Sequence, residues 1–119
     1  MTKQNYKLIL LILNKTELID DVVTLFLELG IKGATVLEST GMAKFLSEDI
    51  PLFAGFREIL KGARPNNMTI FSVVPEEIVE KVATGLEEVV GDFNEPENGL
   101  FFSIPISNIW GEEKIKDNE

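Results

Sequence analysis

Apolar residues are grouped in four short runs that have the length and composition of β-strands. The first, Tyr6–Leu13, is almost continuously apolar, which is typical of a strand in the middle of a sheet. Gly33–Thr40 and Met68–Val74 are rich in β-branched residues, and Leu100–Ile104 is stopped by Pro105. The chain is therefore predicted to form four strands.

A helical spacing of apolar residues follows the first strand. Asn14 and Glu17 are placed three residues apart, as in a capping box, and Gly30 is placed to end the helix in the left-handed conformation. One face is apolar and the opposite face is acidic. The apolar positions are Leu18, Val22, Leu25, Phe26 and Leu29.

A second helical pattern follows the third strand. Pro75 suits a first helical turn, and Glu76 and Glu77 favour its positively polarised end. The apolar face of this helix consists of Val79, Val82, Ala83, Leu86 and Val90.

The order of these elements predicts the fold class. Two strand–helix–strand units joined by a long loop indicate an α+β, ferredoxin-like βαββαβ sandwich with a four-stranded antiparallel sheet and two helices on one face. At 119 residues the chain suits one domain, residues 1–119. The core is expected in segments 8–13, 18–29, 79–90 and 100–104, and residues 112–119 are expected to form a frayed, charged tail.

Composition excludes several classes of function. Twenty acidic residues against 11 basic ones give a net charge of -9, which disfavours binding to nucleic acid. The chain has no His and no Cys, so it lacks the usual general base and thiol nucleophile, and we expect neither an enzyme nor a zinc site. No export signal or membrane segment is recognised, which predicts a cytoplasmic location.

The connection Gly91–Gly99 offers five oxygen-bearing side chains in nine residues. Hard cations take such ligands, but the spacing does not match a calcium-binding loop. A turn rich in turn-forming residues is the favoured interpretation, and no metal site is predicted.

The loop at residues 41–67 is long for a compact domain and is unusually apolar. Apolar anchors beside an arginine resemble the hot spots of protein interfaces, so we expect this loop to bind a protein partner. The alternative is that it packs against its own domain or oligomer. The residues in question are Leu52, Phe53, Phe56, Arg57 and Leu60.

Taken together, the order and spacing of these segments resemble the PII signalling family (nitrogen regulatory protein P-II). The specific points are Gly30–Val36, Glu38–Met42, Val79–Val82 and Gly99–Pro105, and the long loop lies where that family carries its T-loop, between strands 2 and 3. The resemblance implies a homotrimer that binds adenine nucleotides between subunits. It also implies control of targets such as membrane transporters through the loop.

The resemblance also suggests the ligand-binding residues. Thr35 falls near the expected adenine, and Gly41 at the base of the T-loop. The complete set of candidates is Thr35, Gly41, Met42, Gly91, Asp92 and Gly99.

Several positions depart from the family pattern. The connection 91–99 has no basic residue, Leu100 stands where a lysine is common, and Ile109 and Trp110 lie near the positions of family arginines. Triphosphate needs Lys, Arg, metal or aligned amides, so ordinary ATP binding is not expected. The candidates that remain are an adenine-containing molecule with fewer phosphates, a cation, or no ligand, and no cofactor is assigned.

The interpretation that follows is a divergent PII-like regulator with a role in nitrogen regulation. It senses a small effector, controls a partner such as a membrane transporter, and is recruited to the inner face of the membrane. The alternative is a trimeric cation-tolerance or structural module like the CutA family, although the absence of His and Cys disfavours soft metals.

Overall fold

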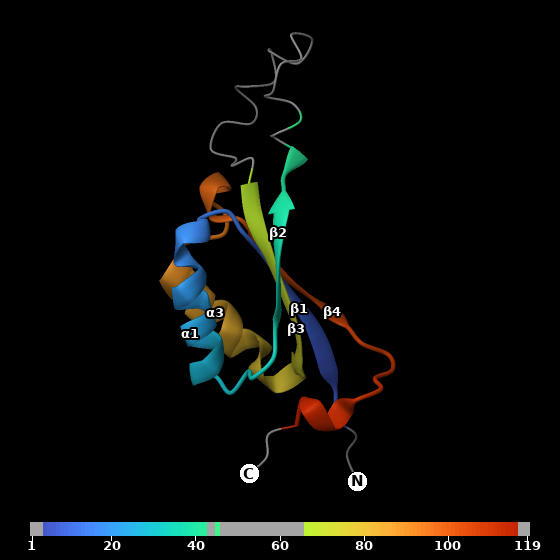
Figure 1. Cartoon of the computed structure of the whole chain (residues 1–119). Helices are drawn as coiled ribbons and strands as arrows, with labels where there is room; N and C mark the ends of the chain where they lie inside the picture. Colours follow the sequence, from blue (N-terminus) through green and yellow to red (C-terminus); the bar gives the residue numbers. More distant parts are fainter. Residues whose placement is uncertain (1–3, 43–44, 46–65, 117–119) are drawn as a thin grey trace.

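A computed structural model describes residues 4–42, 45 and 66–116. It contains the four predicted strands and both predicted helices in the predicted order (Figure 1). The strands are β1 (Tyr6–Leu13), β2 (Thr35–Thr40), β3 (Asn66–Pro75) and β4 (Leu100–Pro105); the helices are α1 (Ile19–Glu28) and α3 (Val79–Val90). Short 3-10 turns are η1 (Thr16–Leu18), η3 (Glu76–Ile78), η4 (Pro96–Asn98) and η5 (Glu112–Lys114).

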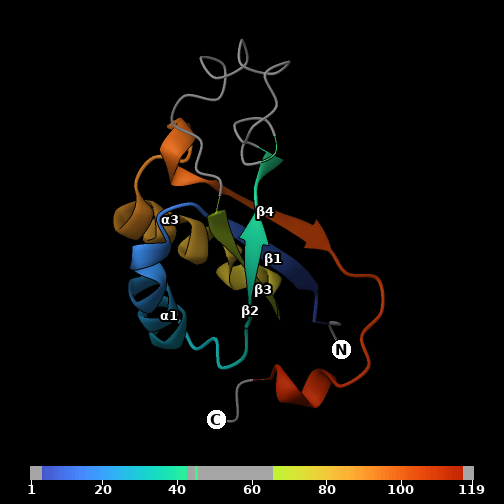
Figure 2. The ribbon, with the colours of Figure 1, turned by 45° about the horizontal axis from the view of Figure 1, so that its top comes forward.

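The four strands form one antiparallel sheet in the order β2-β3-β1-β4, so β1 and β3 are central. Both helices cover the same face of this sheet (Figure 2). The predicted α+β, ferredoxin-like βαββαβ fold is therefore confirmed. Residues 43–44 and 46–65 of the predicted long loop, which include all five predicted partner-binding residues, lie outside the described residues, and β3 begins at Asn66, within the predicted loop.

The core lies between the helices and the covered face of the sheet. In β1, Ile9, Leu11 and Leu13 are buried there, because alternate side chains of a strand point to the same face. The helices contribute residues spaced four apart, which stand above one another on one helix face. The core residues are Ile9, Leu11, Leu13, Val22, Phe26, Ile31, Ile70, Val74, Val82, Leu86 and Val90.

The first helix begins differently from the prediction but ends as predicted. Its first turn is η1, whose N-cap is Lys15 without a side-chain capping bond, whereas Asn14 donates from Nδ2 to the carbonyl oxygen of Pro96, 3.4 Å away. At the other end, Gly30 has φ 85° and the Ile31 amide donates to the Phe26 carbonyl. This is a Schellman motif, and it buries Ile31 against the core.

Two further expectations are corrected. The fourth strand was expected to contribute to the core, but Leu100 and Ile104 are exposed and Phe101 is the only residue of β4 packed against the core among those described. The reason is that β4 is an edge strand whose other face has no covering layer. The second correction concerns the tail, because Glu112–Lys114 forms η5 instead of a frayed end.

The connection between α3 and β4 is held by internal hydrogen bonds. Buried Asn98 donates from Nδ2 to the Asp92 carbonyl at 2.7 Å, and the Asp92 carboxylate accepts the Asn94 amide at 2.9 Å. Gly99 has φ 87°, and a Cβ at this position would lie 1.9 Å from the carbonyl oxygen of Ile12 in β1. Both the conformation and the space therefore require glycine.

The C-terminal segment returns to the start of β1, close to the N-terminus (Figure 1). The Tyr6 hydroxyl donates to Glu112 Oε2 at 2.9 Å, and the Ile106 amide donates to the Tyr6 carbonyl at 3.3 Å. Burial of the ring raises the pKa of Tyr6 above its ordinary value of 10.0, and the hydrogen bond and negative charge of Glu112 raise it further. Tyr6 therefore fixes η5 against the end of the sheet.

We expect Gly99→Ala to destabilise the protein by about 2–4 kcal/mol, because it adds backbone strain and a clash with the Ile12 carbonyl. Gly33→Ala is the matched control, since a Cβ there meets no atom within 4 Å, and it should change stability by no more than about 0.5 kcal/mol. Urea denaturation followed by circular dichroism measures both. Equal losses in the two variants would contradict the packing described for Gly99.

We expect Tyr6→Phe to lower the free energy of unfolding by about 1 kcal/mol at pH 7, because it removes the hydrogen bond to Glu112. The folded state favours the protonated hydroxyl, so this tyrosine contributes fully below pH 10 and its contribution falls as pH rises through its raised folded pKa. The difference in stability between wild type and Tyr6→Phe should thus shrink above pH 10. A difference independent of pH would argue against the assigned role of the hydroxyl.

Candidate functional site

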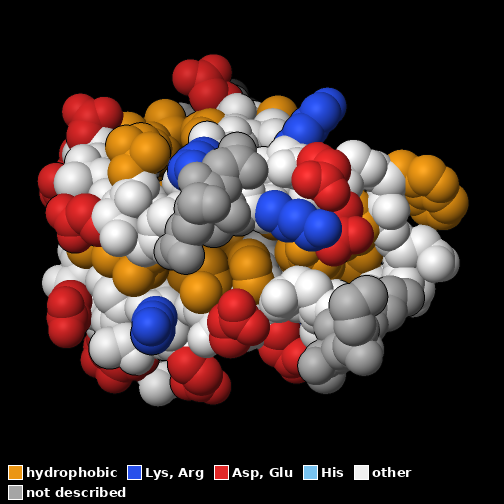
Figure 3. Space-filling view, turned by 90° about the horizontal axis from the view of Figure 1, so that it is seen from below, with side chains coloured by type: hydrophobic (Ala, Val, Ile, Leu, Met, Phe, Trp, Pro, Cys, Tyr) orange, Lys and Arg blue, Asp and Glu red, His pale blue; other side chains and the backbone are white. Residues whose placement is uncertain are grey.

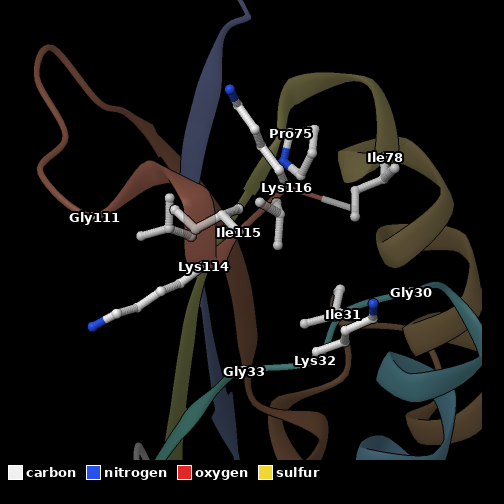
Figure 4. A pocket seen from close by; sticks show the side chains of 12 residues that line it. Gly30, Ile31, Lys32, Gly33, Pro75, Ile78, Gly111, Lys114, Ile115 and Lys116 are labelled. Atoms are coloured by element: carbon white, nitrogen blue, oxygen red, sulfur yellow. The ribbon is translucent and has the colours of Figure 1, made fainter. Parts of the chain in front are cut away.

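A cavity of about 290 Å³ lies at the end of the sheet where the C-terminal segment docks. Three separate segments form its wall: the turn between α1 and β2, the connection from β3 to α3, and η5 with the residues after it (Figure 4). Its lining residues are Gly30, Ile31, Lys32, Gly33, Val73, Val74, Pro75, Ile78, Gly111, Lys114, Ile115 and Lys116. Sequence analysis did not predict this cavity.

The inside of this cavity is apolar and its mouth is basic. Ile31, Ile78 and Ile115 each line the cavity from a different segment, whereas the ammonium groups of Lys114 and Lys116 extend away from it (Figure 4). None of the twelve lining residues is Asp or Glu. Seen from below, this end of the molecule carries acidic side chains along much of its rim and apolar side chains between them (Figure 3).

Two glycines give the wall its shape. Gly30 at the end of α1 and Gly111 before η5 both have positive φ, 85° and 99°, so each reverses the chain where it enters the cavity wall. The Tyr6–Glu112 hydrogen bond then holds η5, and with it Ile115, in place. The cavity therefore depends on contacts between the two ends of the described chain.

A second cavity of about 350 Å³ lies beside β1 and the connection from β4 to η5. Its lining includes Tyr6, Ile109, Trp110 and Glu112. The side chain of Trp110 is 90% exposed, which is rare for so large an apolar group.

The residues predicted to bind an adenine ligand do not meet in one protomer. Thr35 begins β2, and Gly41 and Met42 follow its other end, so about 20 Å of strand separates Thr35 from Gly41. Gly91, Asp92 and Gly99 belong to the connection between α3 and β4. None of these residues lines the 290 Å³ cavity.

The face of the sheet opposite the helices is a further candidate surface, which we call the open sheet face. Its side chains follow from the register, because directly paired residues point to the same side. Phe71, Leu10 and Phe102 form one row across three strands, and Val73, Leu8 and Ile104 form the next. Phe102 is 37% exposed and Ile104 44%. Such a contiguous apolar surface marks an interaction site.

Polar residues interrupt the open sheet face where β2 and β3 approach the long loop. Ser39 is paired with Asn67, and its hydroxyl is hydrogen-bonded to the Asn67 side chain and, at 2.8 Å, to Thr69 Oγ1. These three side chains lie on the same side as Leu37, the partner of Thr69. The open sheet face therefore has an apolar middle and one hydrogen-bonded polar end.

The described residues contain neither a metal-binding cluster of acidic residues nor a membrane-spanning helix. In that part of the chain, no group of three or more Asp or Glu residues is arranged to hold a metal ion. No helix within residues 4–42, 45 and 66–116 is long and apolar enough to cross a membrane.

Comparison with known proteins supports the fold but gives little sequence similarity. No protein-family model and no curated protein matches the chain. Among solved structures, it is similar to PII of Arabidopsis thaliana bound to citrate, with a TM-score of 0.59 and 22% identity. The match covers 88% of this chain and 80% of that one. The order and arrangement of its strands and helices are thus those of PII, and the chain is a divergent PII-like protein in its fold.

Proposed function

We propose that this protein is a cytoplasmic PII-like regulator that senses a small effector and controls a partner protein through the loop at residues 41–67. The observation that carries the proposal is the shared fold over 88% of the chain. Within that fold the loop joins β2 to β3, two adjacent strands of the sheet. A membrane transporter with a role in nitrogen regulation is the proposed partner.

The active form in this proposal is a homotrimer assembled through the open sheet face. A monomer would leave Leu100, Phe102 and Ile104 in contact with water, at a cost of about 25 cal/mol for each Å² of apolar surface. Facing these surfaces toward one another in a closed ring removes them from water. The hydrogen-bonded Ser39–Asn67 pair at the polar end favours one register over others.

The effector in this proposal binds between protomers. A cleft between protomers brings together residues that one protomer keeps apart, namely Thr35 from one end of β2 and the Gly91–Gly99 connection. That connection carries Asp92, Glu95 and Glu97 and no basic residue, so it disfavours a triphosphate. We therefore propose an adenine ligand with fewer phosphates than ATP. A thermal-shift screen of nucleotides identifies it, because a ligand that binds the folded state raises the melting temperature.

Light scattering should give about three times the chain mass of 13.3 kDa for the wild type. Phe102→Glu should convert this species to a monomer, because a charge would be buried in the proposed interface. Leu27→Glu is the matched control: Leu27 is 61% exposed on α1, on the helix side of the sheet, and the variant should remain trimeric. A monomeric wild type at micromolar concentration would refute the trimer.

Replacement of the loop anchors tests the regulatory role directly. Phe53→Ala with Phe56→Ala should leave the melting temperature nearly unchanged and abolish binding to membranes that contain the partner, with a loss of about 2 kcal/mol or more for each anchor. If the loop instead packs against its own trimer, the double variant should lose about 3 kcal/mol or more of stability, as buried phenylalanines do. A large drop in melting temperature would therefore contradict the docking role.

A further inference from the structure

The 290 Å³ cavity is a built site that neither the fold comparison nor the proposed regulatory role assigns. Its walls come from three segments far apart in the sequence, and each supplies one isoleucine, Ile31, Ile78 or Ile115 (Figure 4). A space lined by apolar side chains with a few polar groups at its mouth is the usual form of a small-molecule site.

The charge at the mouth of the cavity is opposite to that of the protein. Over the whole chain acidic residues exceed basic ones by nine, yet Lys32, Lys114 and Lys116 line the cavity and no acidic residue does. The described residues contain six lysines, and the other three are Lys7, Lys15 and Lys81. Half of these lysines therefore line one cavity, although Glu112 and Glu113 precede Lys114 in the chain and lie outside the lining.

The lysines can serve a ligand without entering the cavity. Their alkyl stems contribute to the wall while the ammonium groups of Lys114 and Lys116 reach outward, which is how long basic side chains combine an apolar contact with a solvated charge. Lys116 pairs with Glu113 at 3.3 Å, but the two side chains are 49% and 86% exposed. Such an exposed pair is weak, so an incoming anion can compete for this ammonium group.

The lining determines what kind of ligand fits. The wall is mainly apolar and suits a small alkyl body, and a metal cation would find no carboxylate in it. We propose that the cavity binds a small amphipathic anion, with an alkyl body against the three isoleucines and a carboxylate or phosphate head beside the lysines.

Octanoate and octyl phosphate are the probes, titrated separately into the full-length protein with labelled isoleucine methyl groups. We expect saturable shifts at Ile31, Ile78 and Ile115, with a dissociation constant of about 1 mM or tighter for at least one probe. The probe with the lower dissociation constant shows whether the site prefers a carboxylate or a phosphate head group. Shifts confined to Ile12 and Ile104, which lie on the open sheet face, would overturn the proposal, as would no binding of either probe.

The contribution of charge is tested with neutral and cationic analogues and with paired variants. Octanol and octylamine should bind more weakly than the anions. Lys114→Glu with Lys116→Glu should weaken binding about tenfold, whereas Lys15→Glu with Lys81→Glu, which changes the net charge equally, should not. Circular dichroism establishes whether each variant is folded. If the variant with Lys114→Glu and Lys116→Glu does not fold, Lys114→Gln with Lys116→Gln is used in its place. Equal affinities for octanol and octanoate, or equal losses in the two pairs, would refute an anion site.

Discussion

The sheet has a helical layer on only one of its two apolar faces, and most features of this protein follow from that imbalance. The covered face is satisfied by α1 and α3, which bury Ile9, Leu11 and Ile70 almost completely. The other face presents Leu10, Phe71 and Phe102 in a row, and Phe102 on the edge strand is 37% exposed. A single protomer of this size cannot supply a third layer, so a second copy is the simplest source of one.

Periodic patterns of apolar residues explain how a chain with few identical residues has the same fold. Only 22% of residues are identical to those of Arabidopsis thaliana PII over the matched region, yet the elements and their arrangement agree. Alternation along the strands and a four-residue spacing along the helices place apolar groups in the core, and many sequences satisfy these patterns. The connection 91–99 is not constrained by these patterns, and it contains no basic residue.

The C-terminal segment links the fold to the chemistry of the surface. Tyr6 at the start of β1 holds Glu112, and η5 then completes the wall of an apolar cavity with a basic mouth. Both ends of the described chain are needed for the cavity, because η5 lines it and Tyr6, near the other end, holds η5 in place. If the protein responds to two ligands, one between protomers and one in this cavity, the two sites share the turn from Gly30 to Thr35.

The amino-acid sequence by itself determined the secondary structure, the order of the strands along the chain and the βαββαβ fold, because these follow from local periodicity and from Gly30 and Pro75. It did not determine which apolar strand residues are buried: Leu100, Phe102 and Ile104 read as core residues, but β4 is an edge strand and its outer side is uncovered. Tertiary structure also decided that Glu112–Lys114 forms the 3-10 turn η5 and that the 290 Å³ cavity exists. Both depend on residues more than 70 positions apart: Tyr6 is hydrogen-bonded to Glu112, and Ile31 and Ile115 line the same cavity. No local pattern in the sequence encodes such distant pairings.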